Sequence, residues 1–289
     1  LRHQTHMKMK LSLSQKAGLL SLGLLAVILL VWQLATLPET HAVAADVDPE
    51  YAALMGGGAT KAASSFPTPA AMAQTLWDKL SDPFYDNGPN DKGIGIQLAY
   101  SLARVLGGFF LAAVVAIPLG FAIGNSRVFY QAINPYVQLL KPISPLAWMP
   151  LALYTIKDAS ASAIFVIFIC SLWPMLINTA HGVANVRKDW LDVSRTLEVN
   201  PLRKAFRVIL PAAAPTILTG MRISMGIAWL VIVAAEMLVG GTGIGYFVWN
   251  EWNNLALTNV IFAILVIGVV GMALDAMFAR LQKGVTYAE

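Results

Sequence analysis

The chain has 289 residues, of which 57% are hydrophobic and 12% charged, and its mean hydropathy is +0.64. Soluble domains carry roughly twice that share of charged side chains, so this composition excludes water as the main solvent. The single cysteine, Cys170, excludes an intrachain disulfide and a thiolate metal cage, and the net charge of +4 is spread between apolar runs, which does not indicate a nucleic-acid-binding face.

The N-terminal part begins with a basic segment, residues 1–16, which we expect on the cytoplasmic side of a membrane; its first six residues precede Met7 and are excluded from fold reasoning. The apolar run 17–37 resembles a signal peptide, and Ala42 to Ala44 offer an A-x-A site. About 20 apolar residues suffice to span a bilayer, however, so we expect a retained helix. Residues 38–97 form an outside loop with a predicted amphipathic helix near Trp77, either at the membrane interface or solvated.

Five further apolar runs make up the rest of the chain. Each matches the hydrocarbon thickness of about 30 Å at a rise of about 1.5 Å per residue. Backbone groups in lipid must be paired internally, so these runs predict helices rather than open strands. We therefore predict an all-α polytopic membrane protein with about six transmembrane helices, five of them in a core over 98–281. The five runs are 98–123, 136–156, 159–180, 212–239 and 255–279.

The distribution of basic residues predicts the orientation of these helices. With the N-terminus inside, twelve Lys and Arg residues lie in the inside segments between the runs and four lie in the outside segments. Short cytoplasmic loops carry an excess of Lys and Arg, so both termini are expected to be cytoplasmic.

Three prolines, Pro142, Pro145 and Pro150, fall within the predicted third span. Each removes a backbone donor, so this helix is expected to kink or break. Irregular backbone at membrane depth is tolerated where it is buried in protein or lines a watery cavity. Ser144 and Trp148 are therefore candidates to line a pathway, and a simple packing kink is the alternative.

Charged residues inside the predicted spans are a second set of candidates. An ionised side chain in a membrane is costly unless it is paired or hydrated. We expect Glu236 to accept backbone hydrogen bonds at an outer gate or to pair with a neighbour. Arg222 or Arg104 is a candidate to attract an anion, and snorkelling to the interface is the alternative for both.

The segment 192–211, DVSRTLEVNPLRKAFRVILP, is too charged for lipid and shows two amphipathic stretches broken at Asn200-Pro201. It resembles the EAA loop of ABC-importer permeases, with Pro211 on the final proline of that motif and Glu198 in place of its glycine. In that family the loop, here 185–211, is the coupling helix that docks on the ATPase subunit. The resemblance implies ATPase-coupling roles for Asp192, Arg195, Glu198, Asn200, Arg203 and Phe206.

Longer strings over most of the chain resemble the nitrate-type permeases of ABC importers, whose relatives carry bicarbonate, cyanate or taurine. The strings include KPISPLAWMPLAL (141–153) and PTILTGMRISMGIAWLVIVAAEMLVGGTGIGYFVWNEWN (215–253). No phosphate-binding G-x-x-x-x-G-K-[ST] loop is present, and no Ser/His/Asp grouping can be assigned, so we expect a transport subunit rather than an enzyme. The glycines Gly241, Gly243 and Gly245 predict a tight turn near the outer mouth.

The resemblance implies a type I permease fold in the bacterial inner membrane, importing nitrate or a similar small anion by alternating access. It also implies the partners: a second copy of the permease, cytoplasmic ATPase subunits that bind ATP and Mg, an external solute-binding protein and membrane lipid, with no nucleic acid and no cofactor in this chain. Bicarbonate or cyanate is the alternative cargo. From other classes, the alternatives are an ATP-independent secondary transporter or channel and a membrane anchor for a soluble complex.

Overall fold

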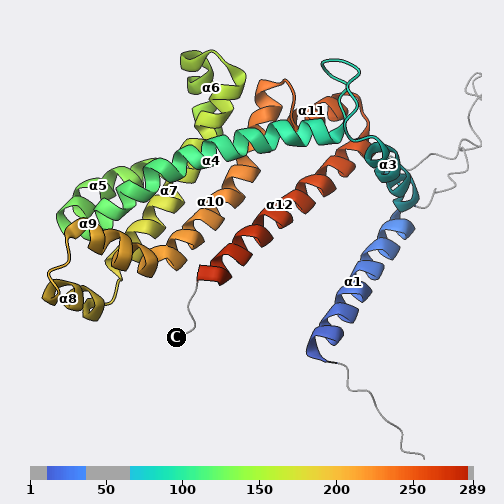
Figure 1. Cartoon of the computed structure of the whole chain (residues 1–289). Helices are drawn as coiled ribbons and strands as arrows, with labels where there is room; N and C mark the ends of the chain where they lie inside the picture. The colour runs from blue at the N-terminus through green and yellow to red at the C-terminus, as the bar shows by residue number, and fades with distance from the viewer. Residues whose placement is uncertain (1–11, 37–65, 286–289) are drawn as a thin grey trace, which may run out of the picture. The chain divides into compact units, whose positions relative to one another are not determined.

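The computed structural model describes residues 12–36 and 66–285 (Figure 1). Every regular element in these ranges is helical, apart from an isolated bridge between Asp86 and Lys92, so the predicted all-α fold is confirmed. Most of the predicted N-terminal segment and of the linker after the first span lies outside the described residues. The chain divides into two compact units, residues 1–78 and 79–289, each of which is described by itself.

The N-terminal unit contains α1, Leu13–Ala35, which is long and apolar enough to cross a membrane, as predicted. A capping box closes its first turn: the Gln15 N–H donates to Ser12 Oγ at 3.3 Å, and the Ser12 N–H donates to Gln15 Oε1 at 3.0 Å. Near the other end, Trp32 Nε1 donates to the carbonyl of Pro67 at 3.0 Å. This bond ties the end of α1 to the segment that precedes the next helix.

The predicted amphipathic helix is present as α3, Pro69–Ser81. Its Met72 side chain is buried, whereas Trp77 on the same helix is 78% exposed. An amphipathic helix with an exposed tryptophan is typical of the membrane interface. The helix is thus confirmed, and its interfacial position stays a prediction.

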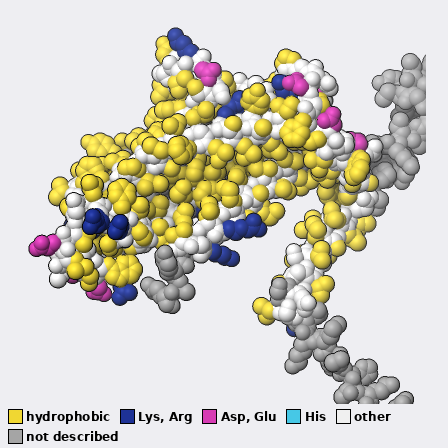
Figure 2. Space-filling model, in the orientation of Figure 1, with side chains coloured by type: hydrophobic (Ala, Val, Ile, Leu, Met, Phe, Trp, Pro, Cys, Tyr) yellow, Lys and Arg dark blue, Asp and Glu magenta, His cyan; other side chains and the backbone are white. Residues whose placement is uncertain are grey.

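Four long helices form the core of the second unit. Helix α7 packs against both α4 and α10, and α12 packs against α10 (Figure 1). Apolar side chains cover the face of this unit that Figure 2 shows, and Lys and Arg lie at its ends and edges. An apolar belt of this kind is what contact with lipid requires. The helices are α4 (Ile94–Asn125), α7 (Ala159–Ala184), α10 (Leu210–Val239) and α12 (Leu257–Val285).

Glycines bring α4 and α7 into close contact and reveal their relative direction. A Cβ added at Gly108 would clash with Ile167, and a Cβ added at Gly124 would clash with Val183. Small residues at such contacts allow membrane helices to approach closely. Because the residue numbers rise together along both helices, α4 and α7 are parallel.

Helix α10 runs antiparallel to α7, and helix α12 runs antiparallel to α10. Gly182 of α7 lies against Thr216 of α10, whereas Asn178, one turn earlier in α7, lies against Gly220, one turn later in α10. The Gln282 side chain of α12 donates to Thr219 at 2.8 Å. The end of α12 and the start of α10 therefore lie at the same end of the bundle.

The run 136–156 breaks at its prolines, as predicted. The described residues contain five helices that are long and apolar enough to cross a membrane, and this run is not among them. It is divided between α5, Arg127–Leu140, and α6, Pro145–Ile156. The cause is local: Pro142 and Pro145 cannot donate backbone hydrogen bonds, so the helix ends at Leu140 and restarts with Pro145 at its first position.

The broken pair nevertheless returns the chain from one end of the bundle to the other. Because α4 and α7 are parallel, the segment that joins the end of α4 to the start of α7 must run back along the bundle. That segment consists of α5 and α6 (Figure 1). The third predicted crossing is thus made by two short helices with a break between them.

Candidate functional site

A helical hairpin projects from the end of the bundle where α7 stops and α10 begins (Figure 1). It consists of α8, Lys188–Thr196, and α9, Pro201–Lys204. The predicted break at Asn200-Pro201 is confirmed, since Pro201 is the first residue of α9 and the Asn200 side chain accepts from the Leu202 N–H at 3.1 Å. Large apolar side chains are exposed on the hairpin and in the turn that follows it: Trp190, Val193, Leu197, Leu202 and Phe206, at 45%, 58%, 70%, 70% and 67%.

The turn between α8 and α9 is a Schellman motif with glutamate in the position that glycine usually takes. Glu198 has φ +51°, the left-handed conformation. The Val199 N–H donates to the Ser194 carbonyl at 3.1 Å, and the Glu198 N–H donates to the Arg195 carbonyl at 3.0 Å. The glycine of the EAA pattern falls on this residue because the backbone there is left-handed. The structure thus settles the turn geometry that the glutamate had put in question.

The charged residues of the hairpin leave most of their surface open. Arg195 pairs with Asp192 at 3.1 Å, with side chains 71% and 64% exposed. Exposed pairs of this kind contribute about 0–1 kcal/mol of stability, so the charges are not explained by a need to hold the hairpin together. Glu198 and Arg203 are exposed as well. The predicted coupling residues are therefore exposed, as are the large apolar side chains of the same segment.

A π-helical turn joins the hairpin to the membrane-spanning helix α10. It covers Ala205–Ile209, and the Leu210 N–H donates to the Ala205 carbonyl five residues back. Pro211, which ends the EAA-like motif, explains the wider turn because a proline ring clashes with the carbonyl four residues before it. The motif proline thus sets the path by which the hairpin enters the bundle.

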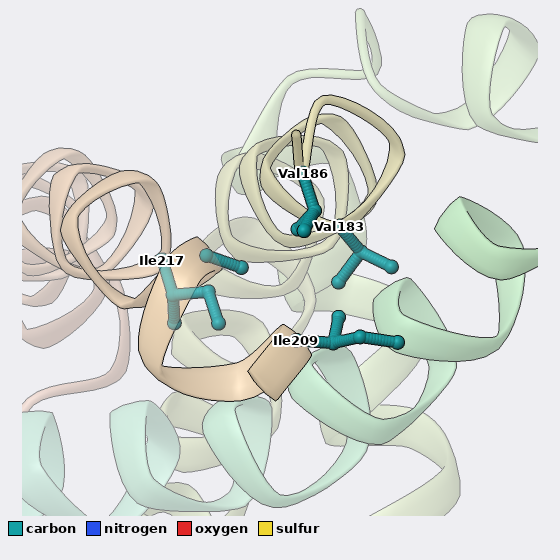
Figure 3. Close-up of a cluster of buried hydrophobic side chains, with 5 residues drawn as sticks. Val183, Val186, Ile209 and Ile217 are labelled. Carbon is teal, nitrogen blue, oxygen red and sulfur yellow. The ribbon is translucent and has the colours of Figure 1, made fainter. Parts of the chain in front are cut away.

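A buried apolar cluster fixes this junction against α7. Figure 3 shows Ile209 from the π-turn and Ile217 from α10 beside Val183 and Val186 at the end of α7. All four side chains are at most 8% exposed. Because the interior is close-packed, a displacement of the hairpin is transmitted to the ends of both helices.

A second candidate lies in the bundle around Glu236, which is near the end of α10. Its carboxylate accepts from Arg104 Nη1 at 2.7 Å, from Ser101 Oγ at 2.8 Å and from the Gly245 N–H at 3.0 Å. The Glu236 and Arg104 side chains are 2% and 13% exposed. The predicted contacts of Glu236, with a neighbouring charge and with backbone, are confirmed; the gate role is untested.

This network also holds the glycine turn between α10 and α11, Ile244–Asn253. Arg104 Nη1 donates to the Thr242 carbonyl at 2.6 Å, and the Gly243 N–H donates to Gln97 Oε1 at 2.6 Å. Gly243 has φ +158°, and a Cβ there would collide with the Glu236 carboxyl group. The predicted tight turn is thus confirmed, and glycine is required because the carboxylate occupies the space of a side chain.

The two candidate anion-attracting arginines both have carboxylate partners. Arg104 is neutralised by Glu236, and it also donates from Nε to Ser160 Oγ at 2.9 Å. Arg222 forms a two-pronged pair with Asp275, with both hydrogen bonds at 2.6 Å and side chains 38% and 55% exposed. The attraction of an anion by either arginine stays a prediction, and the pairing reduces the charge that each offers.

Ser144 and Trp148 lie apart from both groups. Ser144 is exposed and precedes α6, and Trp148 is half-buried with its Nε1 atom lacking a hydrogen-bond partner in the described residues. No hydrogen bond among the described residues joins either of them to Glu236. Their place in a pathway also stays a prediction. Among the residues that the structure describes, no group of three or more His, Cys, Asp or Glu side chains is placed to hold a metal ion.

Residues 97–287 match the model of the binding-protein-dependent transport system inner membrane components. The chain belongs to this family. It is therefore a multi-pass membrane permease subunit of an ABC importer and not an enzyme, and the ATPase is a separate subunit.

The chain is similar to several named permeases. The chain is 46% identical over 226 residues to the nitrate import permease protein NrtB of Synechocystis sp., covering 78% of this chain and 82% of the relative. It is 43% identical to the bicarbonate transport system permease protein CmpB of the same organism, covering 71% and 73%. An inward-facing structure of the MetNI methionine ABC transporter is 17% identical, with a TM-score of 0.59 over 66% of this chain and 95% of that chain, which supports the type I permease fold.

The sequence reasoning did not identify the partners that hold Glu236 in the permease. Gln97, Ser101 and Arg104 all come from α4 and reach the glycine turn or the carboxylate. They are spaced four and three residues apart, so they lie on one face of a helix. A polar stripe of this spacing inside an apolar run was the available signal.

Proposed function

We propose that this permease imports nitrate as a homodimer, with two cytoplasmic ATPase subunits that bind ATP and Mg and an external solute-binding protein that delivers the anion. ATP binding closes the ATPase subunits, and the α8–α9 hairpin converts that closure into an outward-facing pathway. Hydrolysis of ATP then resets the inward-facing state. This is alternating access driven by a two-state element.

The observation that carries the proposal is the exposed surface of the hairpin. Val193, Leu197, Leu202 and Phe206 expose apolar area next to the charged groups of Asp192 and Arg203, on an element that is too charged to enter lipid. Contiguous exposed apolar area mixed with charges is typical of protein–protein contact sites. The closely packed apolar cluster around Ile209 supports transmission of movement from this surface to α7 and α10.

The charge distribution supports a cytoplasmic location for the hairpin and for both termini. The segment 185–211 alone contains Arg187, Lys188, Arg195, Arg203, Lys204 and Arg207. The opposite end of the core, around 239–252, contains no Lys or Arg. The positive-inside rule therefore favours the hairpin end as the cytoplasmic end, and α12 ends there too.

The relatives support nitrate first and bicarbonate second. Two relatives named as nitrate import permeases are 46% and 45% identical to this chain, and two bicarbonate permeases are 43% identical. Nitrate and bicarbonate are both small, planar and monovalent, so the fold alone does not separate them. Bicarbonate is accordingly the second candidate.

The test is ATPase stimulation of the assembled complex in liposomes. Binding protein is loaded in turn with nitrate, bicarbonate, cyanate or taurine, and ATP hydrolysis and anion uptake are measured together. Nitrate is expected to give the largest stimulation and ATP-dependent uptake. Stimulation by bicarbonate alone would replace the cargo and keep the mechanism, whereas full-rate uptake by the permease without ATPase subunits would overturn the ATP-driven proposal.

A further inference from the structure

Helix α5 carries a stripe of polar residues that no role described so far uses. Arg127, Tyr130, Asn134, Gln138 and Lys141 follow one another at spacings of three and four residues. At about 100° per residue, they fall within an arc of roughly 80° on one side of the helix. The other residues of α5 include large apolar side chains with much exposed surface, such as Val128 and Leu139.

All five residues of this α5 stripe line one cavity. The cavity has a volume of about 580 Å³, and its far wall comes from α7, with Leu176, Ala180 and His181. This space is far larger than a small anion, and apolar side chains such as Ile133 and Val137 share the lining with the polar ones, so it is a vestibule rather than a fitted pocket. Polar side chains within membrane proteins typically face such cavities instead of lipid.

The charge of the cavity has one sign. Its lining includes Arg127 and Lys141 but no Asp or Glu. Arg104 and Arg222 each pair with a carboxylate, whereas neither Arg127 nor Lys141 has a salt bridge within the described residues. A cleft with positive charge and low-dielectric walls concentrates anions.

The cavity lies beside the junction that holds the coupling hairpin. Ile123 and Gly124 in the last turn of α4 line the cavity, while Phe121 and Asn125 of the same turn line a separate space against the hairpin. Movement of the hairpin therefore acts on a helix end whose other side forms the wall of the vestibule. Figure 1 shows α5 alongside the same end of α4.

We propose that the α5 stripe is the inner binding surface for the transported anion, with Arg127 and Lys141 supplying charge and Tyr130, Asn134 and Gln138 supplying hydrogen bonds in place of water. The ligand class is a small monovalent oxyanion. This inference rests on the proposed function and goes further by naming the residues that the anion meets. A weak binding surface suits transport, because an anion that binds too tightly is not released.

The test places a negative charge in the vestibule without changing side-chain size. Gln138→Glu is compared with Gln131→Glu, because Gln131 lies on the same helix, is exposed and does not line the cavity. Nitrate uptake is measured in liposomes with the complete complex, together with assembly of the complex by size-exclusion chromatography. We expect the uptake rate to fall by about tenfold or more for Gln138→Glu and by less than about twofold for Gln131→Glu, because a like charge repels the anion.

The charge at Lys141 provides an independent arm. Lys141→Gln should lower nitrate uptake and Lys141→Arg should restore it. If wild type imports nitrate and Gln138→Glu does so at the same rate, the inference is overturned while the proposed function stands. If Gln138→Glu instead dissociates the complex, the cavity lined by the α5 stripe is a contact surface for the second copy, and the inference is overturned as well. Absence of nitrate uptake by wild type would refute the proposed function itself.

Discussion

The two ends of the helical bundle differ in how far their polar groups are exposed. At the end that carries the α8–α9 hairpin, charges and large apolar side chains are exposed, and the Asp192–Arg195 pair is open to solvent. At the other end, Glu236 and Arg104 are buried and bound to the backbone of the glycine turn. Exposed groups are available to a partner, while buried and satisfied groups fix a conformation. The exposed end therefore offers a surface to a partner, whereas the opposite end is held in one conformation by its own buried contacts.

The largest effect should come from removing the buried charge. Glu236→Gln leaves the Arg104 guanidinium without its counter-charge, and breaking a buried pair costs about 3–5 kcal/mol. The apparent unfolding temperature of the purified protein in detergent should fall strongly. Asp275→Asn is the matched control, because it removes a carboxylate from a more exposed arginine pair and should lower the unfolding temperature less. Equal losses from the two variants would remove the contrast between buried and exposed charge.

A charge on the apolar surface of the hairpin should act on binding and not on folding. Leu202→Asp places a carboxylate on the docking surface, and we expect the affinity for the ATPase subunit to fall by at least about thirtyfold, a loss of about 2 kcal/mol typical of a hot-spot residue. Pull-down and ATPase assays on the purified complex measure this loss.

The control for that variant is Leu255→Asp. Leu255 is 84% exposed and lies in the turn between α11 and α12, away from the hairpin. The same chemical change at that position should leave ATPase binding intact. Unimpaired binding by Leu202→Asp would show that the hairpin does not dock.

A smaller effect is expected in the turn of the hairpin. Glu198 adopts a left-handed backbone, which costs a residue with a Cβ about 1–2 kcal/mol of stability. Glu198→Gly should therefore stabilise α8 by about 1 kcal/mol. Hydrogen exchange of the α8 amides should slow accordingly. Thr196→Gly, at the last residue of α8, should instead speed exchange, since glycine loses more backbone freedom than other residues when it is held in a helix. Faster exchange in Glu198→Gly would contradict the Schellman assignment.

The smallest effect concerns the pH dependence of the loop between α3 and α4. Lys92 Nζ donates to Asp86 Oδ2 at 3.0 Å, and this bond, with the Gly88 N–H, holds the pKa of Asp86 below its ordinary value. A lowered pKa in the folded state stabilises the loop above the ordinary aspartate pKa, and the stabilisation is lost as pH falls through the lowered value. Carboxyl NMR should show Asp86 titrating below the ordinary aspartate value, and Lys92→Gln should raise its pKa. An unchanged titration in that variant would exclude the lysine as the cause.

The sequence predicted the all-α fold, most of the spans and the two-part hairpin because these depend on local properties: apolar runs, proline positions and amphipathic spacing. The break after Leu140 was predicted from Pro142 and Pro145, but the start of α5 at Arg127, ahead of the predicted span 136–156, was not. Contacts between residues that lie far apart in the chain could not be predicted from local sequence. Glu236 meets Ser101 and Arg104 across more than 130 positions, and only tertiary packing brings them together.

The candidate site was predicted to a similar extent. The hairpin residues were identified because the docking motif is contiguous in the chain, and the role of Glu198 became clear once its backbone angle was known. The polar stripe on α5 was overlooked because residues 127–140 were split between a loop and a span. Placed on one helix, the same residues share a face and a cavity.

The central claim is that this permease is driven by a separate ATPase through the α8–α9 hairpin. The most direct measurement is nitrate uptake into liposomes that contain the permease, the ATPase subunits and the binding protein, with and without ATP. The account predicts ATP-dependent uptake by wild type and by Leu255→Asp, and no ATP-dependent uptake by Leu202→Asp. Uptake at the full rate without ATPase subunits, or in the Leu202→Asp complex, would contradict it.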